Sequence, residues 1–340
     1  MKTKKLTVKD IHPESVAEEF NRLMLLDIDE MLRHRSEFID VCCPACHGKE
    51  VPWVFEFQRL DYRRCSSCGT LYISPAPNEQ LHLDFLRKSR AMAFWREQMP
   101  PEMKASRLPM YLDRVAYARS VWKRLGLNPD SVLELGAGNG EFAEELAATG
   151  VAQRIVLLEP QALRLESPNI EIIAEGFEAL ERDDRKFDTV FAWEVIEHVL
   201  EPDEFLRLVR KVLKPGAPLI LSTPNERSVE TRKLGKDSSN ILFDHVRLYN
   251  PSAIQALMTR NGFVIIELCT PGALDVDRLR QYRMSKPEAF VDDPALDLIL
   301  DDGKASESFQ SLLQAHCLSS HMRVVAVAEG DWNGSQTPRR

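Results

Sequence analysis

Seven cysteines occur in the chain, and four of them form two C-x-x-C pairs separated by 18 residues: Cys43 with Cys46, and Cys65 with Cys68. Each pair can turn two thiolates toward one centre, and four thiolates are a ligand set that structural Zn²⁺ prefers. We therefore predict a closed, structural zinc site at these four residues. Free buried thiols and an iron–sulfur cluster are the alternatives.

Three glycines stand at alternate positions in residues 133–140, which read L-E-L-G-A-G-N-G. This segment ends an expected strand and opens an expected helix, where glycines permit a tight turn and let a ligand approach the backbone. Glu134 lies in this strand, and Glu159 ends the next strand, 19 residues beyond Gly140. An acid at that second place can accept hydrogen bonds from both hydroxyls of a ribose, so the pattern predicts a nucleoside-containing ligand.

A dinucleotide is the nearest alternative ligand, because its fingerprint is G-x-G-x-x-G with alanine tolerated at the third glycine. Counted from Gly136, that third place is Glu141, which breaks the pattern. Counted from Gly138, it is Ala143, but the first fingerprint glycine should directly follow the strand. Glu141 at the helix start would also repel a pyrophosphate. A ligand with ribose and adenine but no phosphates fits better, and a purely structural turn is the remaining alternative.

These motifs, with L-L-E-P at 157–160 and F-D-T-V-F-A-W-E-V-I-E-H-V at 187–199, resemble class I S-adenosylmethionine-dependent methyltransferases. The resemblance implies a Rossmann-like, seven-stranded sheet whose last strand, at 322–329, is reversed. It also implies which residues surround the cofactor S-adenosylmethionine. These are Glu134, Gly136, Gly138 and Gly140 at the methionine part, Glu159 and Pro160 at the ribose, Gly176, Phe177 and Glu178 at the adenine, and Glu194 where cofactor and substrate meet. Trp193 would lie beside the cofactor or simply fill the core.

Methyl transfer to a hydroxyl or a carbon acid requires a base, and histidine suits that role near neutral pH. His198 follows the fourth expected strand and His245 lies in the loop after the fifth, and the carboxyl ends of parallel strands face the site. Sugar C-methyltransferases that resemble this chain carry an acid–histidine pair in a similar loop, which here is Asp244 with His245. We predict His245 as the base and His198 as the second candidate, although either can have a supporting role. His321 could reach the same edge of the sheet.

The segment C-P-A-C, followed by C-S-S-C-G-T-L-Y-I-S-P-A-P, is similar to the zinc ribbon that precedes methyltransferases of bacterial sugar and polysaccharide pathways. This resemblance implies a small-molecule acceptor: a sugar, a nucleotide-sugar or a glycan intermediate. Sugar C-methyltransferases often carry a large C-terminal domain, and about 70 residues follow residue 270, which favours O-methylation over C-methylation. An RNA base methyltransferase with a zinc module and a non-catalytic scaffold that binds S-adenosylmethionine are the alternatives.

The net charge of −8 makes the chain a poor candidate for binding a polyanion, which argues against a nucleic-acid partner. No apolar run is long enough to span a membrane, and no apolar targeting segment follows Met1. We therefore expect a cytoplasmic protein without membrane insertion, and the sequence gives no indication of the oligomeric state.

Alternating strands and helices from residue 131 onward predict an α/β fold with a parallel sheet covered on both faces. Before it, we expect helices over 13–36, 78–97 and 109–125, and within it a short helix after residue 160. We predict five parts: an N-terminal helical segment at 1–41, a zinc ribbon at 42–76, linking helices at 77–127, a methyltransferase domain at 128–330 with an acidic insert at 271–319, and a loose tail at 331–340.

Overall fold

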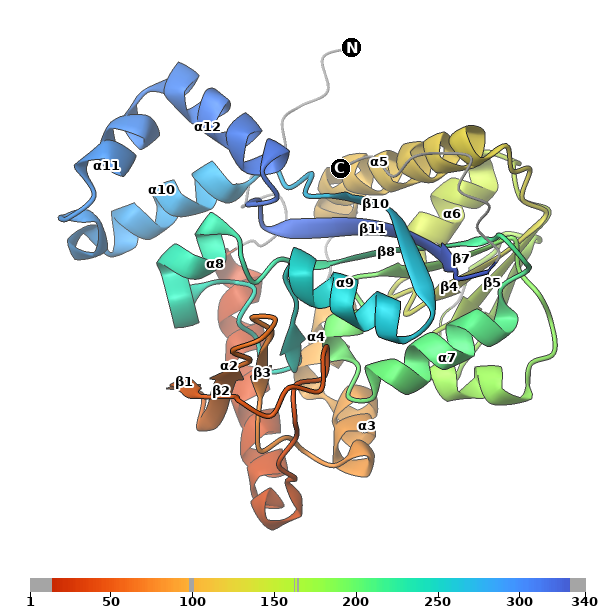
Figure 1. The fold of residues 1–340 in the computed structure, drawn as a ribbon, viewed down its shortest axis with the longest axis horizontal. Helices are drawn as coiled ribbons and strands as arrows, with labels where there is room; N and C mark the ends of the chain where they lie inside the picture. The colour runs from red at the N-terminus through yellow and green to blue at the C-terminus, as the bar shows by residue number, and fades with distance from the viewer. Residues whose placement is uncertain (1–13, 98–100, 162, 164, 331–340) are drawn as a thin grey trace.

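The structure is a computed structural model that describes residues 14–97, 101–161, 163 and 165–330. The described residues form two sheets with helices around them (Figure 1). The larger sheet contains β4 (Ser131–Leu135), β5 (Arg154–Leu158), β6 (Ile170–Ile173), β7 (Thr189–Trp193), β8 (Pro218–Pro224), β10 (Phe263–Cys269) and β11 (His321–Ala328). The smaller one contains β1 (Trp53–Phe57), β2 (Leu60–Arg64), β3 (Leu71–Ile73) and β9 (Arg247–Leu248).

The larger sheet has the strand order β10-β11-β8-β7-β4-β5-β6. Neighbouring strands from β6 to β8 pair in parallel, whereas β11 is antiparallel to both β8 and β10. Strands β4, β7 and β8 are buried along their whole length, as expected for apolar strands covered on both faces. The predicted seven-stranded α/β sheet with a reversed last strand is confirmed.

Helices cover both faces of this sheet. Helices α5 (Pro101–Leu125) and α6 (Glu141–Ala148) bury Trp122 and Phe142 in one core. Helices α7 (Pro202–Val212) and α9 (Pro251–Arg260) bury Phe205 and Leu257 in the other. The two apolar layers hold the strands rigidly, so the loops at their carboxyl ends receive fixed starting points.

The N-terminal elements are α2 (Glu14–Leu32), η1 (Arg35–Glu37), α3 (Glu79–Lys88) and α4 (Arg90–Glu97). The prediction of one helix over 78–97 is wrong, because the chain leaves helical geometry at Ser89 (ψ 122°). The buried carboxylate of Asp27 stabilises this break, since it accepts hydrogen bonds from the Ser89 hydroxyl (2.8 Å) and the Ala91 N–H (3.0 Å). The prediction that a helix starts at Pro109 is also wrong, since Pro109 lies inside α5 although proline favours a helix start.

The smaller sheet joins the cysteine-rich segment to the larger sheet. Strand β3 pairs with β9 of the loop after β8, and Tyr72 lies opposite Arg247. Tyr249, the residue directly after β9, accepts a hydrogen bond at its carbonyl from the N–H of Glu226 at 2.8 Å. Asn225 forms a β-bridge with the same tyrosine. The short stretch at 247–249 is therefore held from both sides, by the ribbon and by the end of β8.

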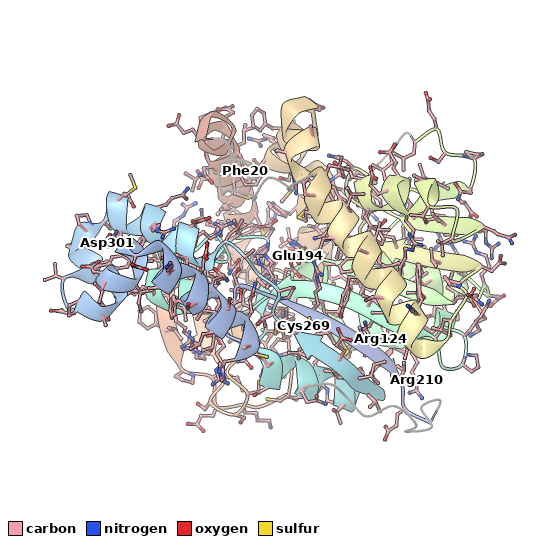
Figure 2. All side chains as sticks on the ribbon, turned by 90° about the horizontal axis from the view of Figure 1, so that it is seen from above. Phe20, Arg124, Glu194, Arg210, Cys269 and Asp301 are labelled. Atoms are coloured by element: carbon pink, nitrogen blue, oxygen red, sulfur yellow. The ribbon has the colours of Figure 1, made fainter. Side chains whose placement is uncertain are left out.

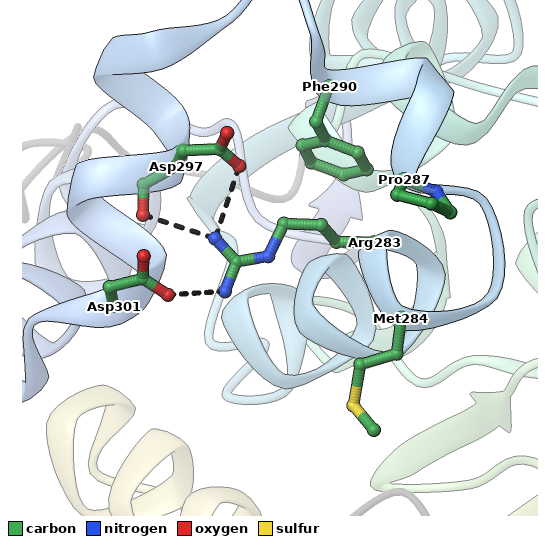
Figure 3. Close-up of a pocket in the computed structure, with 6 residues that line it drawn as sticks. All are labelled: Arg283, Met284, Pro287, Phe290, Asp297 and Asp301. Atoms are coloured by element: carbon green, nitrogen blue, oxygen red, sulfur yellow. Dashed lines mark hydrogen bonds and ion pairs between the residues drawn. The ribbon is translucent and has the colours of Figure 1, made fainter.

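The insert projects beyond the larger sheet, at the upper left of Figure 1. Its helices and those leading to it are α8 (Val229–Leu234), η4 (Gly235–Asp237), α10 (Asp275–Ser285), η5 (Pro287–Phe290), α11 (Pro294–Asp301) and α12 (Gly303–Ala315). A pocket lies among α10, η5 and α11 (Figure 3). Its guanidinium, Arg283, already pairs with Asp297 and Asp301, so the charged groups of this pocket satisfy one another.

Three further predictions concern the segment after Pro160, the two ends of the chain and membrane-spanning helices. The described residues after Pro160 contain no helix before β6, so the short helix expected there is wrong for them. The tail at 331–340 and the first 13 residues lie outside the described residues. Of the helices that the structure describes, none has the length and apolar character needed to span a membrane.

Candidate active site

The glycine loop connects β4 to α6 in a left-handed backbone geometry. Gly136, Gly138 and Gly140 have φ values of 64°, 58° and 81°. A Cβ atom at Gly136 would lie 2.8 Å from Cγ2 of Val195, whereas a Cβ atom at Gly138 would meet nothing within 4 Å. The loop is thus closely packed at its first glycine and faces open space at its second, which is the arrangement that a ligand lying against the backbone needs.

Two carboxylates flank this loop. Glu134 is buried in β4, and its Oε2 atom has no hydrogen-bond partner among the described residues. Burial, opposed in part by Arg114, raises the pKa of Glu134 to about 8. The Glu159 carboxylate, at the end of β5, accepts the N–H groups of Gly138 at 3.0 Å and Gln161 at 3.2 Å. Since an unpaired buried acceptor is costly, Glu134 marks a place where a donor group of a ligand would be stabilised.

The residues expected at the adenine lie at the start of η2 (Phe177–Arg182), on the segment that follows β6. The ring of Phe177 packs edge-on against Phe205, with the ring centroids 5.3 Å apart. Pro160 is half-buried next to Glu159. Gly176, Phe177 and Glu178 therefore border the same edge of the sheet as the glycine loop, and their role toward adenine stays a prediction.

Trp193 ends β7 and makes the contacts of a core residue. Its ring stacks on Phe191, with the ring centroids 5.8 Å apart and the planes inclined by 18°. The guanidinium of Arg114, from α5, lies 5.1 Å from the Trp193 ring centroid. Of the two roles expected for Trp193, these contacts support core packing.

Glu194 directly follows β7 and forms an ion pair with His321, the first residue of β11. Oε2 of Glu194 lies 3.2 Å from Nε2 of His321, and its Oε1 accepts a short hydrogen bond from the Ser222 hydroxyl. Burial alone would raise the pKa of Glu194, but His321, Arg114 and Ser222 outweigh it and lower the pKa to about 2. Seen from above, Glu194 lies between α5 and the insert (Figure 2). His321, which we expected to reach this edge of the sheet, lies there beside Glu194.

Glu197, His198 and His245 form a cluster beyond the carboxyl ends of β7 and β8, where η3 (Ile196–His198) meets the loop that leads to β9. One ligand atom from each lies within 4.8 Å of the other two. The two imidazole rings meet edge to face, with centroids 4.9 Å apart. Nδ1 of His198 donates to the carbonyl of Asp244 at 2.8 Å, and Nδ1 of His245 donates to that of Asn240 at 3.0 Å. Because a carbonyl only accepts, each ring keeps its lone pair on Nε2.

The carboxylate of Asp244 lies near the ring of His198. Its Oδ2 atom lies 3.7 Å from Nδ1 of His198, while the Nδ1 atom of His245 is held within its own turn by Asn240. The role of the Asp244–His245 pair stays a prediction, and the structure adds His198 as a neighbour of the Asp244 carboxylate. Burial, opposed in part by Asp244, lowers the pKa of His245 to about 4, so this ring is neutral at neutral pH.

His82 on α3 fixes the backbone of His198 from the opposite side. Nε2 of His82 donates to the His198 carbonyl at 2.6 Å. Burial lowers the pKa of His82 to about 4, so it acts as a neutral donor. The helix that follows the cysteine-rich segment thus positions one member of the cluster.

The four cysteines of the two C-x-x-C pairs gather at one point of the ribbon. The sulfurs of Cys43 and Cys68 are 3.4 Å apart, those of Cys46 and Cys65 are 3.5 Å apart, and all four lie within 4.8 Å of one another. A Cβ atom at Gly48 would lie 3.1 Å and 3.3 Å from two of these sulfurs, so the turn closes tightly around them. This geometry is compatible with a zinc ribbon, because four thiolates bind Zn²⁺ at about 2.3 Å each in a tetrahedron.

Glu226 connects the ribbon to the loop after β8. It is fully buried, and its Oε1 atom lies 2.9 Å from Arg64 of β2 and 2.9 Å from Arg232 of α8. Asn250 donates through its amide to the carbonyl of Cys68 at 3.0 Å. A displacement of the ribbon would therefore also displace residues in the segment 226–250.

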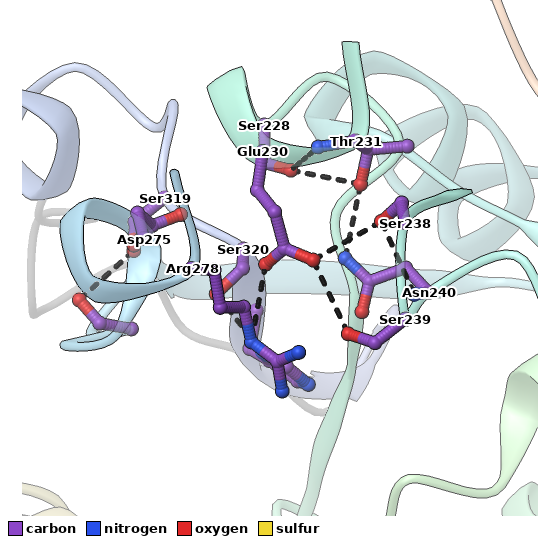
Figure 4. A network of polar contacts seen from close by, with 12 residues as sticks. Ser228, Glu230, Thr231, Ser238, Ser239, Asn240, Asp275, Arg278, Ser319 and Ser320 are labelled. Carbon is purple, nitrogen blue, oxygen red and sulfur yellow. Dashed lines mark hydrogen bonds and ion pairs between the residues drawn. The ribbon is translucent and has the colours of Figure 1, made fainter. Parts of the chain in front are cut away.

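A buried polar network holds the insert against the same loop (Figure 4). The carboxylate of Glu230 accepts the hydroxyls of Ser238 (3.1 Å) and Ser239 (3.2 Å) and pairs with Arg278 of α10 at 3.5 Å. The amide of Asn240 donates to Thr231 at 2.9 Å. Since the Asn240 carbonyl holds the His245 ring, this network fixes the orientation of that imidazole.

Sequence reasoning missed several of these residues. Glu197 directly precedes His198 in the segment W-E-V-I-E-H, so the candidate base His198 was the sequence feature that could have pointed to Glu197. No local sequence signal marks His82, Arg114 or Glu226, because the partners of these residues are far away in the chain.

A family model described as a methyltransferase domain matches residues 97–268, which is just over half of the chain. The chain therefore belongs to the methyltransferase-domain family.

Curated proteins similar to the chain include a probable S-adenosylmethionine-dependent methyltransferase of Mycobacterium tuberculosis, 29% identical over 47% of this chain and 58% of the relative. A ubiquinone biosynthesis O-methyltransferase of Xanthomonas oryzae pv. oryzae is 29% identical over 42% and 62%, respectively. The match thus spans about three fifths of these relatives. Among solved structures, a putative sarcosine dimethylglycine methyltransferase from Galdieria sulphuraria aligns over 67% of this chain and 88% of that one, with 13% identity and a TM-score of 0.44.

Proposed function

We propose that this protein is an S-adenosylmethionine-dependent methyltransferase that methylates a hydroxyl of a small, sugar-linked acceptor. The observation that carries the proposal is that one edge of the sheet holds both the glycine loop and the Glu197–His198–His245 cluster. A methyl donor on the loop and an acceptor at the cluster would be neighbours, which satisfies the proximity that transfer requires.

The residues around the loop fit S-adenosylmethionine, which supplies an electrophilic methyl group on its sulfonium when bound. Glu134, with its unpartnered Oε2, would accept the ammonium of the methionine part. Glu159 would accept the ribose hydroxyls while its contacts with Gly138 and Gln161 keep the loop in place. The glycines permit the close approach.

At the acceptor side, His245 is the candidate for taking up the hydroxyl proton. Its ring is neutral, it is oriented by Asn240, and its lone pair is on Nε2. His198 and Asp244 would support this role as a charged or polar pair beside it. In-line displacement then needs only that the acceptor oxygen lies between Nε2 and the methyl group.

A sugar-linked acceptor is supported by the resemblance of the ribbon and the methyltransferase motifs to those of bacterial sugar and polysaccharide pathways. It is also supported by the net charge of −8, which disfavours a polyanion such as RNA. O-methylation is supported by the neutral state of the His245 ring, which leaves a lone pair free to take up a hydroxyl proton.

We further propose that Cys43, Cys46, Cys65 and Cys68 bind one structural Zn²⁺. The ribbon is too small to bury a core of its own, so metal binding would supply the folding free energy that apolar burial cannot.

Calorimetry with S-adenosylmethionine tests the cofactor, and transfer of a labelled methyl group to a panel of nucleotide-sugars tests the acceptor. We expect micromolar or tighter cofactor binding and labelling of a sugar, with His245→Ala retaining the cofactor and losing turnover. Absence of cofactor binding would favour a scaffold. Labelling of total RNA instead of any sugar would favour an RNA methyltransferase.

A further inference from the structure

We propose that Glu197, His198 and His245 hold a divalent transition-metal cation, at a site separate from the four cysteines. The ligands would be Nε2 of each imidazole and Oε1 of the carboxylate. Two imidazoles with one carboxylate form a ligand set that suits zinc or ferrous iron and leaves coordination positions open.

The geometry of the three side chains suits one ion. One nitrogen or oxygen atom from each of the three side chains lies within 4.8 Å of the other two, and donors at about 2.0–2.2 Å from a common ion stand roughly 3–4 Å apart. The three residues come from two segments, η3 and the loop before β9, so the ion would join them.

The groups behind the ligands are those that a metal site needs. Metal-binding histidines donate their other ring N–H to a carbonyl or a carboxylate, which fixes the tautomer and the ring orientation. Here both Nδ1 atoms donate to carbonyls, of Asp244 and Asn240, and the Asp244 carboxylate lies 3.7 Å from His198. His82 holds the backbone of His198 in addition. In the neutral form of each ring, Nε2 is therefore the nitrogen whose lone pair is free for a metal.

An independent observation comes from Glu197. Its side chain is fully buried, Oε2 accepts the Thr223 hydroxyl at 3.0 Å, and Oε1 has no partner among the described residues. A buried acceptor without a partner destabilises the fold, and more strongly when it is charged.

The consequence for the reaction rests on the proposed function. A cation with open positions would bind the acceptor oxygen and lower the pKa of its hydroxyl, so the proton could pass to water. The oxygen would then form the new O–C bond as the S–C bond breaks, leaving S-adenosylhomocysteine. His245 would act in this case as a ligand, and the role of base would no longer be required of it.

Cobalt titration of the full chain tests the proposal. The purified protein is treated with a mild chelator, which leaves a four-thiolate zinc site intact, and Co²⁺ is then added. We expect one equivalent to bind with weak visible bands and without the near-ultraviolet band of a cobalt–thiolate bond. Glu197→Gln and His245→Gln should each abolish this binding, whereas His316→Gln, at an exposed histidine, should retain it.

Circular dichroism and the retained zinc establish that each variant is folded. If wild-type protein binds no cobalt, or if both variants bind it as tightly as wild type, the site does not exist. That outcome leaves the proposed function intact where S-adenosylmethionine still binds and methyl transfer proceeds in chelator. Conversely, cobalt binding with no affinity for S-adenosylmethionine would overturn the proposed function and retain the metal site.

Discussion

The carboxylate of Asp244 lies 3.7 Å from Nδ1 of His198, a residue 46 positions earlier in the chain, while its neighbour His245 is oriented by the carbonyl of Asn240. Asp244 therefore orients the ring of His198 through its carbonyl, and its carboxylate lies close to the same ring nitrogen. Glu197, His198 and His245 at this edge form a cluster drawn from two segments of the chain.

Asp244→Asn tests which histidine this carboxylate serves. We expect kcat to fall by about 10–100-fold with unchanged affinity for S-adenosylmethionine, because the orienting charge is lost and the cofactor site is untouched. In double-mutant cycles, Asp244→Asn should be more strongly non-additive with His198→Gln than with His245→Gln. The reverse pattern of coupling would show that the carboxylate acts on His245.

Glu159→Gln should weaken the binding of S-adenosylmethionine by about 10–100-fold, because hydrogen bonds from hydroxyls to a carboxylate contribute about 1.5–3 kcal/mol. Isothermal titration calorimetry measures the change directly. The control is Glu175→Gln, an exposed glutamate that pairs with Arg182 beyond β6. Equal affinities for both variants and wild type would remove Glu159 from the cofactor site.

Cys43→Ser should lower the bound zinc from one ion per chain to none, and the melting temperature should fall with it. Because β3 pairs with β9 beside the cluster, turnover should fall more than affinity for S-adenosylmethionine. Cys42→Ser is a matched control, since Cys42 is adjacent and exposed. Full zinc content in the Cys43 variant would contradict the four-thiolate assignment.

Glu226→Ala should reduce the free energy of unfolding by about 1–3 kcal/mol, because it leaves Arg64 half-buried without its carboxylate. Chemical denaturation measures this loss. For comparison, Glu181→Ala breaks an exposed pair with Arg207 and should change stability by less than about 1 kcal/mol. Similar losses in the two variants would mean that Glu226 does not couple the ribbon to the loop.

The Glu194–His321 ion pair predicts a pH-dependent stability. Burial alone would lower the pKa of His321, but Glu194, assisted by Glu230 and opposed by Arg278, raises it above its ordinary value. A raised histidine pKa stabilises the fold fully below about pH 6.5, and this stabilisation is lost as the pH rises through the folded-state pKa. Since the pKa of Glu194 is lowered to about 2, its carboxylate stays charged throughout this range.

Melting temperatures of wild type and His321→Gln at pH 6 and pH 9 test this linkage. The deficit of the variant should be larger at pH 6, where the wild-type imidazole is protonated. The exposed His316→Gln should show no such dependence. An equal deficit at both pH values would indicate that the pair is not ionic.

Local spacing in the sequence determined the chemistry that this chain can carry. The C-x-x-C pairs specify four sulfurs, and the glycine register with Glu134 and Glu159 favours a nucleoside ligand over a dinucleotide. The alternation of apolar strands and helices predicts a parallel sheet covered on both faces, whereas the reversed last strand is implied by the resemblance to class I methyltransferases. These features depend on residues close in the chain, so periodicity and spacing are sufficient to recognise them.

Only the tertiary structure decided which distant residues meet. It paired β3 with β9, placed Glu226 between Arg64 and Arg232, and set His82 behind His198. It also turned Asp244 toward His198 and brought Glu197 to the two imidazoles. No local pattern encodes these contacts, because each depends on how the ribbon and the insert pack against the carboxyl ends of β7 and β8. Helix breaks such as the one at Ser89 have the same origin: the carboxylate that stabilises the break, Asp27, comes from another helix.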